Sequence, residues 1–191
     1  MQARSPGFTL IELMVALAIV ALLLLLGMPS FTTFVRNSEI RSTSESIING
    51  LRTASTKAAN LNRPVTFSLK GGVGAAWTGW DVTYVDDDGT TQLVQQYARK
   101  EAGSSSQVTP DPPDKVTVSF NSLGRIVNQG ILPIDHIQTI DICIDSCAPD
   151  SEFRPLKIIV DDPLPGSKRG LRMCDPNPAL AALVPPDPRA C

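Results

Sequence analysis

One carboxylate stands alone in the most apolar stretch of this sequence, where its chemistry would be an ion pair. Glu12 is the only ionisable side chain between Phe8 and Met28. As a helix, residues 8–28 would be about 30 Å long, close to the thickness of the hydrocarbon core of a bilayer. A carboxylate in that core costs about 2.5–3.5 kcal/mol on insertion scales. We therefore expect a membrane-spanning helix in which something compensates the charge of Glu12.

The charges before this segment set its orientation. Arg4 and the initiator amine precede it, so the positive-inside rule leaves the N-terminus in the cytoplasm and exports the rest of the chain. A cleavable secretory signal is a competing interpretation, but the apolar run is too long for one and no A-x-A-like site follows. A plain signal anchor would explain the length and leave Glu12 unexplained.

Four cysteines near the C-terminal end are the next candidates for chemistry: Cys143, Cys147, Cys174 and Cys191. An even number in an exported domain favours two disulfides, although free thiols or a zinc site are alternatives. Zinc is disfavoured because the spacing lacks paired C-x2-C knuckles and the chain has a single histidine. Three connectivities are possible, and we favour Cys143 with Cys147, closing a turn, and Cys174 with Cys191, fixing the tail.

No set of residues for catalysis is evident in the sequence. His136 is solitary, and no nucleophile–histidine–acid set, metal cluster or phosphate-binding loop accompanies it. We expect His136 at the surface or at a strand edge. The run 86–89, DDDG, lacks the alternating spacing of a calcium loop and is typical of a hairpin turn. The sequence predicts no enzyme, no cofactor and no metal site.

The pattern beyond the apolar segment is that of an amphipathic helix. One stripe at steps of four and three is formed by Ile47, Leu51, Ala54, Ala58 and Leu61. Residues 61–64, LNRP, end the helix because a residue before proline avoids the helical conformation. We predict one long kinked helix from about Phe8 to Leu61, in preference to two unrelated helices.

Alternating apolar and polar residues predict several short strands after the helix. They cover residues 65–70, 80–84, 92–98, 116–120, 140–144, 156–160 and 171–174. Residues 121–125 are a predicted turn, and the Gly/Ser/Pro-rich segment 101–114 is a predicted surface loop. The predicted fold is α+β, with an antiparallel sheet packed on the helix stripe.

The run SPGFTLIEL at residues 5–13 resembles the class III signal of type IV pilins and type II secretion pseudopilins. In that family a prepilin peptidase cuts after the glycine and methylates the new N-terminal amine. The resemblance implies cleavage between Gly7 and Phe8, with Phe8 as the methylated N-terminus. It implies that Glu12 pairs with a neighbouring subunit's N-terminal amine during assembly. It also implies that Pro29 kinks or loosens the helix.

The remainder looks like the GspH/FimT family of minor pilins and pseudopilins. Residues 51–58, LRTASTKA, are similar to the family's L-x-x-A-R-x-E-A, and residues 170–174, GLRMC, to its G-R-x-R stretch, which cysteine usually follows. The chain departs from both motifs. Ser55 and Thr56 stand where the helix motif has arginine and a variable residue, and Leu171 replaces the first arginine of the second motif.

A compact basic stretch is formed by Lys168, Arg169 and Arg172. FimT-like members have been linked to DNA binding in natural transformation through C-terminal arginines, so the resemblance implies phosphate contacts here. The alternative is a solvated turn, because Asp161 and Asp162 lie nearby and the net charge of -2 gives no general attraction to nucleic acid. So few cations would bind DNA weakly and with strong salt dependence.

The sequence thus predicts a leader at residues 1–7, a transmembrane assembly helix at 8–28, its amphipathic periplasmic continuation at 29–63 and a β-rich periplasmic domain at 64–191. The expected function is that of a minor pilin in the priming or tip complex of a type IV pilus, anchored in the inner membrane. A GspH-like pseudopilin of type II secretion and a DNA-binding pilus subunit are the alternatives. Expected partners are other minor and major pilins or pseudopilins, the prepilin peptidase, the membrane and, in the last alternative, DNA.

Overall fold

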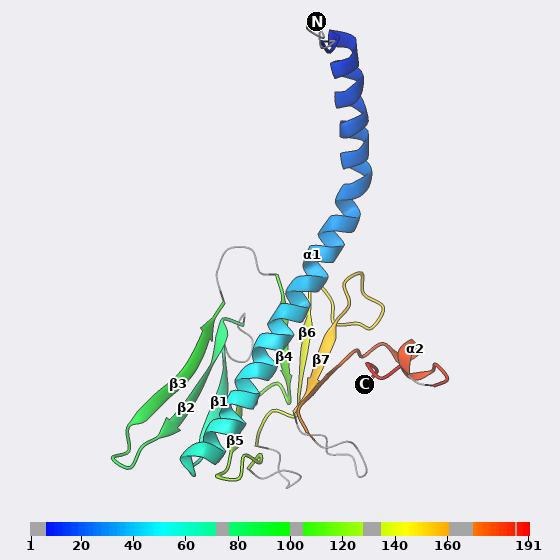
Figure 1. Ribbon diagram of the computed structural model, residues 1–191. Coiled ribbons are helices and arrows are strands. Elements are labelled where there is room, and N and C mark those ends of the chain that lie inside the picture. The colour runs from blue at the N-terminus through cyan, green and yellow to red at the C-terminus, as the bar shows by residue number, and fades with distance from the viewer. Residues whose placement is uncertain (1–6, 72–76, 100–104, 128–134, 161–169, 186) are drawn as a thin grey trace, which may run out of the picture. The chain divides into compact units, whose positions relative to one another are not determined.

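The computed structural model describes residues 7–71, 77–99, 105–127, 135–160, 170–185 and 187–191, with the backbone alone for residues 25–30 (Figure 1). The chain forms two compact units, Met1–Val35 and Arg36–Cys191. Helix α1 (Leu10–Leu61) supplies most of the first unit and continues into the second. The predicted long helix is therefore confirmed.

The first unit exposes apolar side chains on every side of α1. Exposed fractions of the large apolar side chains range from 45% for Val35 to 78% for Leu10, and no part of the first unit's described residues covers them. Among residues with described side chains, no helical stretch has the combined length and apolarity needed to cross a bilayer. The membrane-spanning role of residues 8–28 stays a prediction.

The second unit contains two four-stranded antiparallel sheets, with part of α1 lying against both (Figure 1). Sheet A has the order β3–β2–β1–β5, and sheet B the order β4–β6–β7–β8. In chain order the strands are β1 (Val65–Lys70), β2 (Gly79–Val85), β3 (Thr91–Ala98), β4 (Gln107–Asp111), β5 (Thr117–Phe120), β6 (Thr139–Cys143), β7 (Leu156–Ile159) and β8 (Arg172–Cys174). A short helix, α2 (Pro178–Ala181), lies in the tail.

The buried stripe of α1 packs against the two sheets and forms the hydrophobic core with them. Ile47, Leu51, Ala54 and Ala58 are fully buried, together with Phe67 of β1 and Ile140 of β6. Side chains of sheet A lie close to the helix at Gly50, where a Cβ atom would lie 2.9 Å from Cε2 of Phe67. Glycine is required there because a larger residue would overlap that ring.

The helix ends where the sequence predicts, and a left-handed residue, which the sequence did not indicate, closes its last turn. Asn62 has a φ of 52°, and the N–H of Arg63 donates to the carbonyl of Ala58 at 3.3 Å. The Arg63 guanidinium then donates to Asp86 Oδ1 at 2.8 Å. Leu61, predicted as the last buried member of the stripe, is instead 39% exposed, because the helix ends at that residue.

Both predicted turns are confirmed. Between β2 and β3 the N–H of Asp86 donates to the Thr90 carbonyl at 2.8 Å, and Gly89 has a φ of 81° that suits glycine. Between β5 and residue 126, the side chain of Asn121 accepts from the N–H groups of Leu123 and Arg125. The aspartate run 86–88 is thus part of a hairpin turn.

The predicted loop at residues 101–114 is wrong in its second half, where β4 lies. Its N-terminal part, 101–104, is outside the described residues. β4 pairs with β6, Pro110 facing Ile140, and forms one edge of sheet B. Proline is tolerated in a strand at an edge, where its missing N–H is not needed. This strand opens a second sheet, so the single sheet expected from the sequence is replaced by two.

Of the two positions expected for His136, the surface position is wrong, since the residue is only 3% exposed. Its Nδ1 lies 3.1 Å from Asp135 Oδ1. The cause is the path of the following residues. Ile137 donates its N–H to Thr117 of β5 and Gln138 to Asp111 of β4, so the chain here passes between the two sheets.

Two disulfides join the pairs favoured from the sequence, Cys143 with Cys147 and Cys174 with Cys191, each with Cα atoms 5.0 Å apart. The second one closes the tail onto β8. Beside it, the N–H of Asp175 donates to the carbonyl of Arg189 at 2.7 Å, and the N–H of Cys191 donates to the Asp175 carbonyl at 3.0 Å. The tail is therefore held covalently and by backbone hydrogen bonds.

Replacing Cys174 and Cys191 together by serine is expected to lower the free energy of unfolding by about 3 kcal/mol. The crosslink spans 17 residues, and a loop of about 15 residues removes this much chain entropy from the unfolded state. Urea denaturation measures the difference. The matched control, Cys143 and Cys147 to serine, opens a crosslink across a separation of 4 and should cost less. An equal cost for both would contradict the loop-length argument.

Candidate functional site

The start of α1 forms a helix cap around the predicted assembly carboxylate. The N–H of Glu12 donates to Thr9 Oγ1 at 3.3 Å, and the N–H of Leu13 donates to the Thr9 carbonyl at 3.2 Å. Threonine followed three residues later by glutamate is a capping-box pattern. An acidic side chain in the first turn also interacts favourably with the positive end of the helix dipole. Glu12 thus lies in the capped first turn of the helix.

Gly7 and Phe8 lie before the cap, outside the helix. Phe8 is 85% exposed, and no described atom lies within 4 Å of the position a Cβ would take on Gly7. Packing within this subunit therefore does not require glycine at residue 7. An accessible backbone at this point suits a peptidase, and cleavage after Gly7 stays a prediction.

Large apolar side chains surround the Glu12 carboxylate, which is itself exposed. Leu10, Ile11 and Leu13 are between 56% and 78% exposed. Such a surface is buried only by lipid or by other subunits, and a charge entering it is tolerated only with a partner of opposite sign. The predicted ion pair between Glu12 and the N-terminal amine of another chain stays a prediction. Pro29 lies within α1, and its predicted kink is not tested by the structure.

A polar clasp joins α1 to the start of β4 at the beginning of the second unit. Glu39 Oε1 accepts from the backbone N–H of Ser106 at 2.9 Å and also from that of Ser105. Buried Ser106 lies 3.2 Å from Thr43 Oγ1. Sequence analysis missed this group because its members are 63–67 residues apart and nothing in either segment indicates the other.

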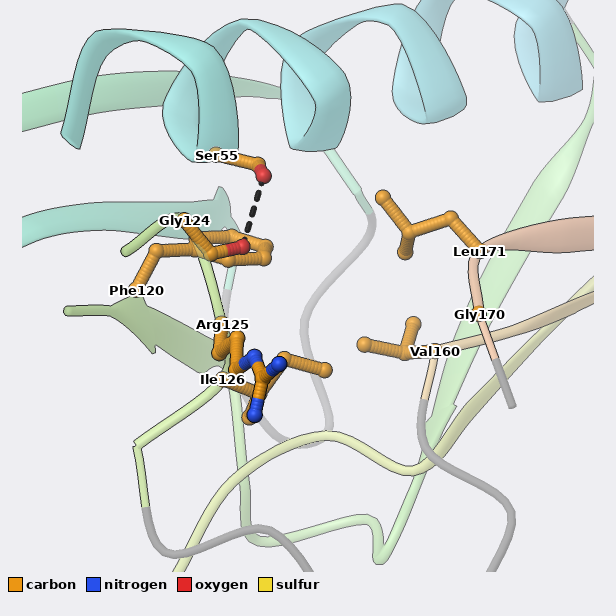
Figure 2. A pocket seen from close by; sticks show the side chains of 8 residues that line it. All are labelled: Ser55, Phe120, Gly124, Arg125, Ile126, Val160, Gly170 and Leu171. Carbon is orange, nitrogen blue, oxygen red and sulfur yellow. Dashed lines mark hydrogen bonds between the residues drawn. The ribbon is translucent and has the colours of Figure 1, made fainter. Parts of the chain in front are cut away.

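Ser55 and Leu171, two positions at which the chain departs from the family motifs, line one cavity of about 440 Å³, which Figure 2 shows. Ser55 of α1 donates to the Gly124 carbonyl at 2.8 Å, and Leu171 lies across the cavity. Phe120, Ile126 and Val160 supply further apolar walls. The turn at residues 121–125 packs directly on the helix, and glycine suits residue 124 because a Cβ there would lie 3.0 Å from the Ser55 carbonyl oxygen.

The predicted basic stretch is only partly described. Lys168 and Arg169 lie outside the described residues, whereas Arg172 lies on β8 and lines a hollow with Arg52 and Glu45 of α1. An adjoining cavity of about 350 Å³ is lined by three more arginines, Arg41, Arg154 and Arg189. These three arginines were missed because they are scattered along the sequence. Together the five arginines form an arginine groove along α1 and β8.

In the tail beside this groove, Asp187 has a lowered pKa that can be measured. The Arg189 side chain donates hydrogen bonds to Asp187 and lowers the pKa of that carboxyl from its ordinary 3.8 to about 2. Because the folded-state pKa is depressed, the stabilising contact is complete above about pH 4 and is lost as the pH falls through 2. NMR titration of Asp187 should give a midpoint near 2. In Arg189→Ala the midpoint should return toward 3.8, and an unchanged midpoint would contradict this pairing.

Among the described residues, no three His, Cys, Asp or Glu side chains gather where a metal ion would bind. The four cysteines are all in disulfides. The structure therefore offers no support, within the described ranges, for the zinc alternative considered from the sequence.

Comparison with known proteins identifies two parts of the chain. Residues 3–28 match the profile of the prokaryotic N-terminal methylation motif, and residues 43–162 match that of the type II transport protein GspH. No curated protein sequence matches the chain. A crystal structure of the type IV minor pilin FimU from Pseudomonas aeruginosa is similar at 14% identity and a TM-score of 0.50, over 67% of this chain and 86% of that one. A second crystal form of FimU gives 13% identity and 0.48, over 63% and 85%.

The FimU likeness concerns the fold: a long N-terminal helix packed on antiparallel strands. The GspH profile covers more than half of the 191 residues, including α1 from residue 43 onward, all of sheet A and most of sheet B. The protein therefore belongs to the GspH family and has a pilin-like fold.

Proposed function

We propose that this chain is a minor pilin that takes part in priming or tip-complex assembly of a type IV pilus, as a structural and not a catalytic subunit. The observation that carries the proposal is the exposed Glu12 carboxylate, placed in the first turn of an apolar helix that matches the methylation motif. The prepilin peptidase cuts after Gly7 and methylates Phe8. Residues 8–28 hold the subunit in the inner membrane, with the second unit in the periplasm.

The electrostatic energy of the Glu12 carboxylate then favours assembly. Within the apolar segment, Glu12 has no cationic side chain to pair with, since residues 8–28 contain no lysine or arginine. The N-terminal amine freed at Phe8 of a neighbouring subunit supplies one. Paired charges are tolerated in an apolar bundle where single ones are not, so the helix gains stability by joining other pilin helices.

Intact mass spectrometry of the chain purified from its native membrane tests the processing step. The expected mass starts at Phe8 and includes one methyl group. A chain that still carries residues 1–7 would rule out the proposal. Deletion of the gene should reduce piliation and twitching, and normal piliation would count against a pilus role.

A pseudopilin of type II secretion is the second candidate, favoured by the match to the GspH profile. The same processing and ion pair would then serve a short periplasmic pseudopilus. The deletion strain distinguishes the two. Loss of secreted proteins with normal pili indicates secretion, and loss of pili with normal secretion indicates a pilus subunit.

The arginine groove favours DNA binding as a third candidate. Five arginines line it, against Glu45 and Asp175 among its acidic lining residues. Gel shifts at low salt, comparing the wild type with Arg52→Ala/Arg172→Ala, test this function. Lys70→Ala, which removes a cation from sheet A, is the matched control. No shift for the wild type would remove this candidate.

A further inference from the structure

The outer edge of β3 is the least protected strand edge in the second unit. β3 lies at the end of sheet A, and no described strand pairs with its other side. Its eight residues, TQLVQQYA, contain no charge and no proline, and all except Val94 are exposed. The other sheet edges are shorter, and β4 also carries Pro110. Exposed edges without charge or proline readily pair with another strand.

The backbone groups on this edge can be assigned from the β2–β3 ladder. Hydrogen-bonded and non-hydrogen-bonded pairs alternate in an antiparallel ladder. Asp86 with Thr90 is hydrogen-bonded at one end, and Thr78 with Arg99 at the other. Counting inward through the register leaves four residues whose N–H and C=O groups face away from β2: Thr91, Leu93, Gln96 and Ala98.

A β-bulge breaks the spacing of these outward groups. Val82 pairs with Gln95 and Thr83 with Leu93, so Val94 is the extra residue. The outward positions therefore run 91, 93, 96 and 98, with a wider step in the middle. A regular strand presents its groups at every second residue, so it matches only one half of this edge.

A second copy of the same edge matches both halves. When two β3 strands run antiparallel about a two-fold axis between Val94 and Gln95, Thr91 faces Ala98 of the second copy and Leu93 faces Gln96 of the second copy. The wider steps of the two copies, each between residues 93 and 96, then lie opposite each other at the axis. Each outward position then meets another outward position, and such pairs exchange two hydrogen bonds. Interfaces of this kind, in which one patch pairs with itself, are the usual basis of two-fold dimers.

The charges at the two ends of β3 fit the same arrangement. The pairing places Arg99 of one copy opposite Thr90 of the other. Asp88 accepts hydrogen bonds from the backbone N–H and hydroxyl of Thr90, so its carboxylate lies at this end, and Asp87 nearby is 92% exposed in its side chain. The cationic end of each strand thus meets the acidic turn of the other copy, and the uncharged middle contains no like-charged pair.

We propose that this protein forms a two-fold dimer by antiparallel pairing of β3 with β3 of a second copy. The proposal does not depend on the role in pilus or pseudopilus assembly. The partner that the edge selects is this chain itself, because the matching bulge excludes unbroken strands from full pairing.

Light scattering of the full chain in detergent, after size-exclusion chromatography over a dilution series, tests the dimer. Gln96→Pro removes an N–H that faces away from β2, so it should weaken association by about tenfold or more while leaving sheet A intact. The matched control Gln96→Ala keeps the N–H and should dimerise as the wild type does. A wild-type monomer at every concentration, or an undiminished Gln96→Pro dimer, would overturn the proposal.

A photocrosslinking residue at Gln92 keeps the test decisive if the proline variant fails to fold. Gln92 faces Tyr97 of the second copy in the proposed register. The expected product is a covalent dimer whose two crosslinked peptides both contain β3. Crosslinks from residue 92 into any other part of the second copy, or none at all, would reject the β3 interface.

Discussion

Replacing Glu12 by alanine is expected to reduce incorporation of the subunit into filaments by about a hundredfold. Removing one member of a buried ion pair costs about 3–5 kcal/mol, and 1.4 kcal/mol corresponds to a factor of ten. The neighbouring amine would remain charged in an apolar bundle without its partner. Immunoblots of sheared filaments against membranes measure the distribution of the subunit.

Processing should survive this substitution because Glu12 lies in the helix, whereas the bond after Gly7 lies before its cap. Leu13→Ala, which trims an exposed apolar neighbour, is the matched control and should be incorporated with a smaller loss. Normal incorporation of Glu12→Ala would refute the ion-pair mechanism. A loss of cleavage would show instead that the carboxylate serves the peptidase.

Replacing Phe67 by alanine is expected to destabilise the second unit by about 3–5 kcal/mol. Phe67 is fully buried, lies 5.8 Å from the ring of Trp80, and contacts α1 at Gly50. Truncation therefore leaves a cavity between sheet A and the helix at Gly50. Urea denaturation followed by tryptophan fluorescence reports the loss, because Trp80 borders the cavity.

Thr66→Ala is the control on the opposite face of β1. It removes a hydroxyl that lies 2.9 Å from Ser119 Oγ, which is worth about 1 kcal/mol or less. If both substitutions destabilise equally, the contact between Phe67, Trp80 and the helix is not the centre of this core.

Elements with a strong local pattern were predictable from the sequence. The stripe from Ile47 to Ala58 has helical spacing because one side of α1 is buried, and β1 alternates because only one face of sheet A meets the helix. The helix end was predictable from Pro64, although the left-handed Asn62 that closes it was not foreseen. The disulfide pairs were predictable because Cys143 and Cys147 are close in the sequence and because a bond from Cys174 to Cys191 fixes the tail.

Features that depend on distant contacts were not predictable. β4 was taken for a loop because Pro110 signals a turn locally, and only its edge position in sheet B makes that proline acceptable. His136 is buried because its neighbours bond to two different sheets. The Glu39 clasp and the arginine groove join residues that carry no mutual signal in the sequence.

For the candidate site, the sequence indicated which residues matter but not which residues lie beside them in the structure. Glu12 stood out through its apolar neighbours, and the structure adds the Thr9 cap that places it in the first turn. The match to the methylation motif supports the same segment. The basic stretch was less predictable, since Arg172 lies with arginines from α1 and from the tail and not only with its sequence neighbours.

Both disulfides belong to sheet B and its tail, whereas sheet A contains no cysteine. Under the proposed periplasmic location, a thiol oxidase forms the crosslinks of sheet B and its tail, whereas sheet A needs no such step. In cells deprived of that oxidase, we expect periplasmic proteases to degrade the C-terminal portion first and to leave a resistant fragment ending after β5. At that proposed location, the lifetime of sheet B and its tail would depend on how oxidising the compartment is.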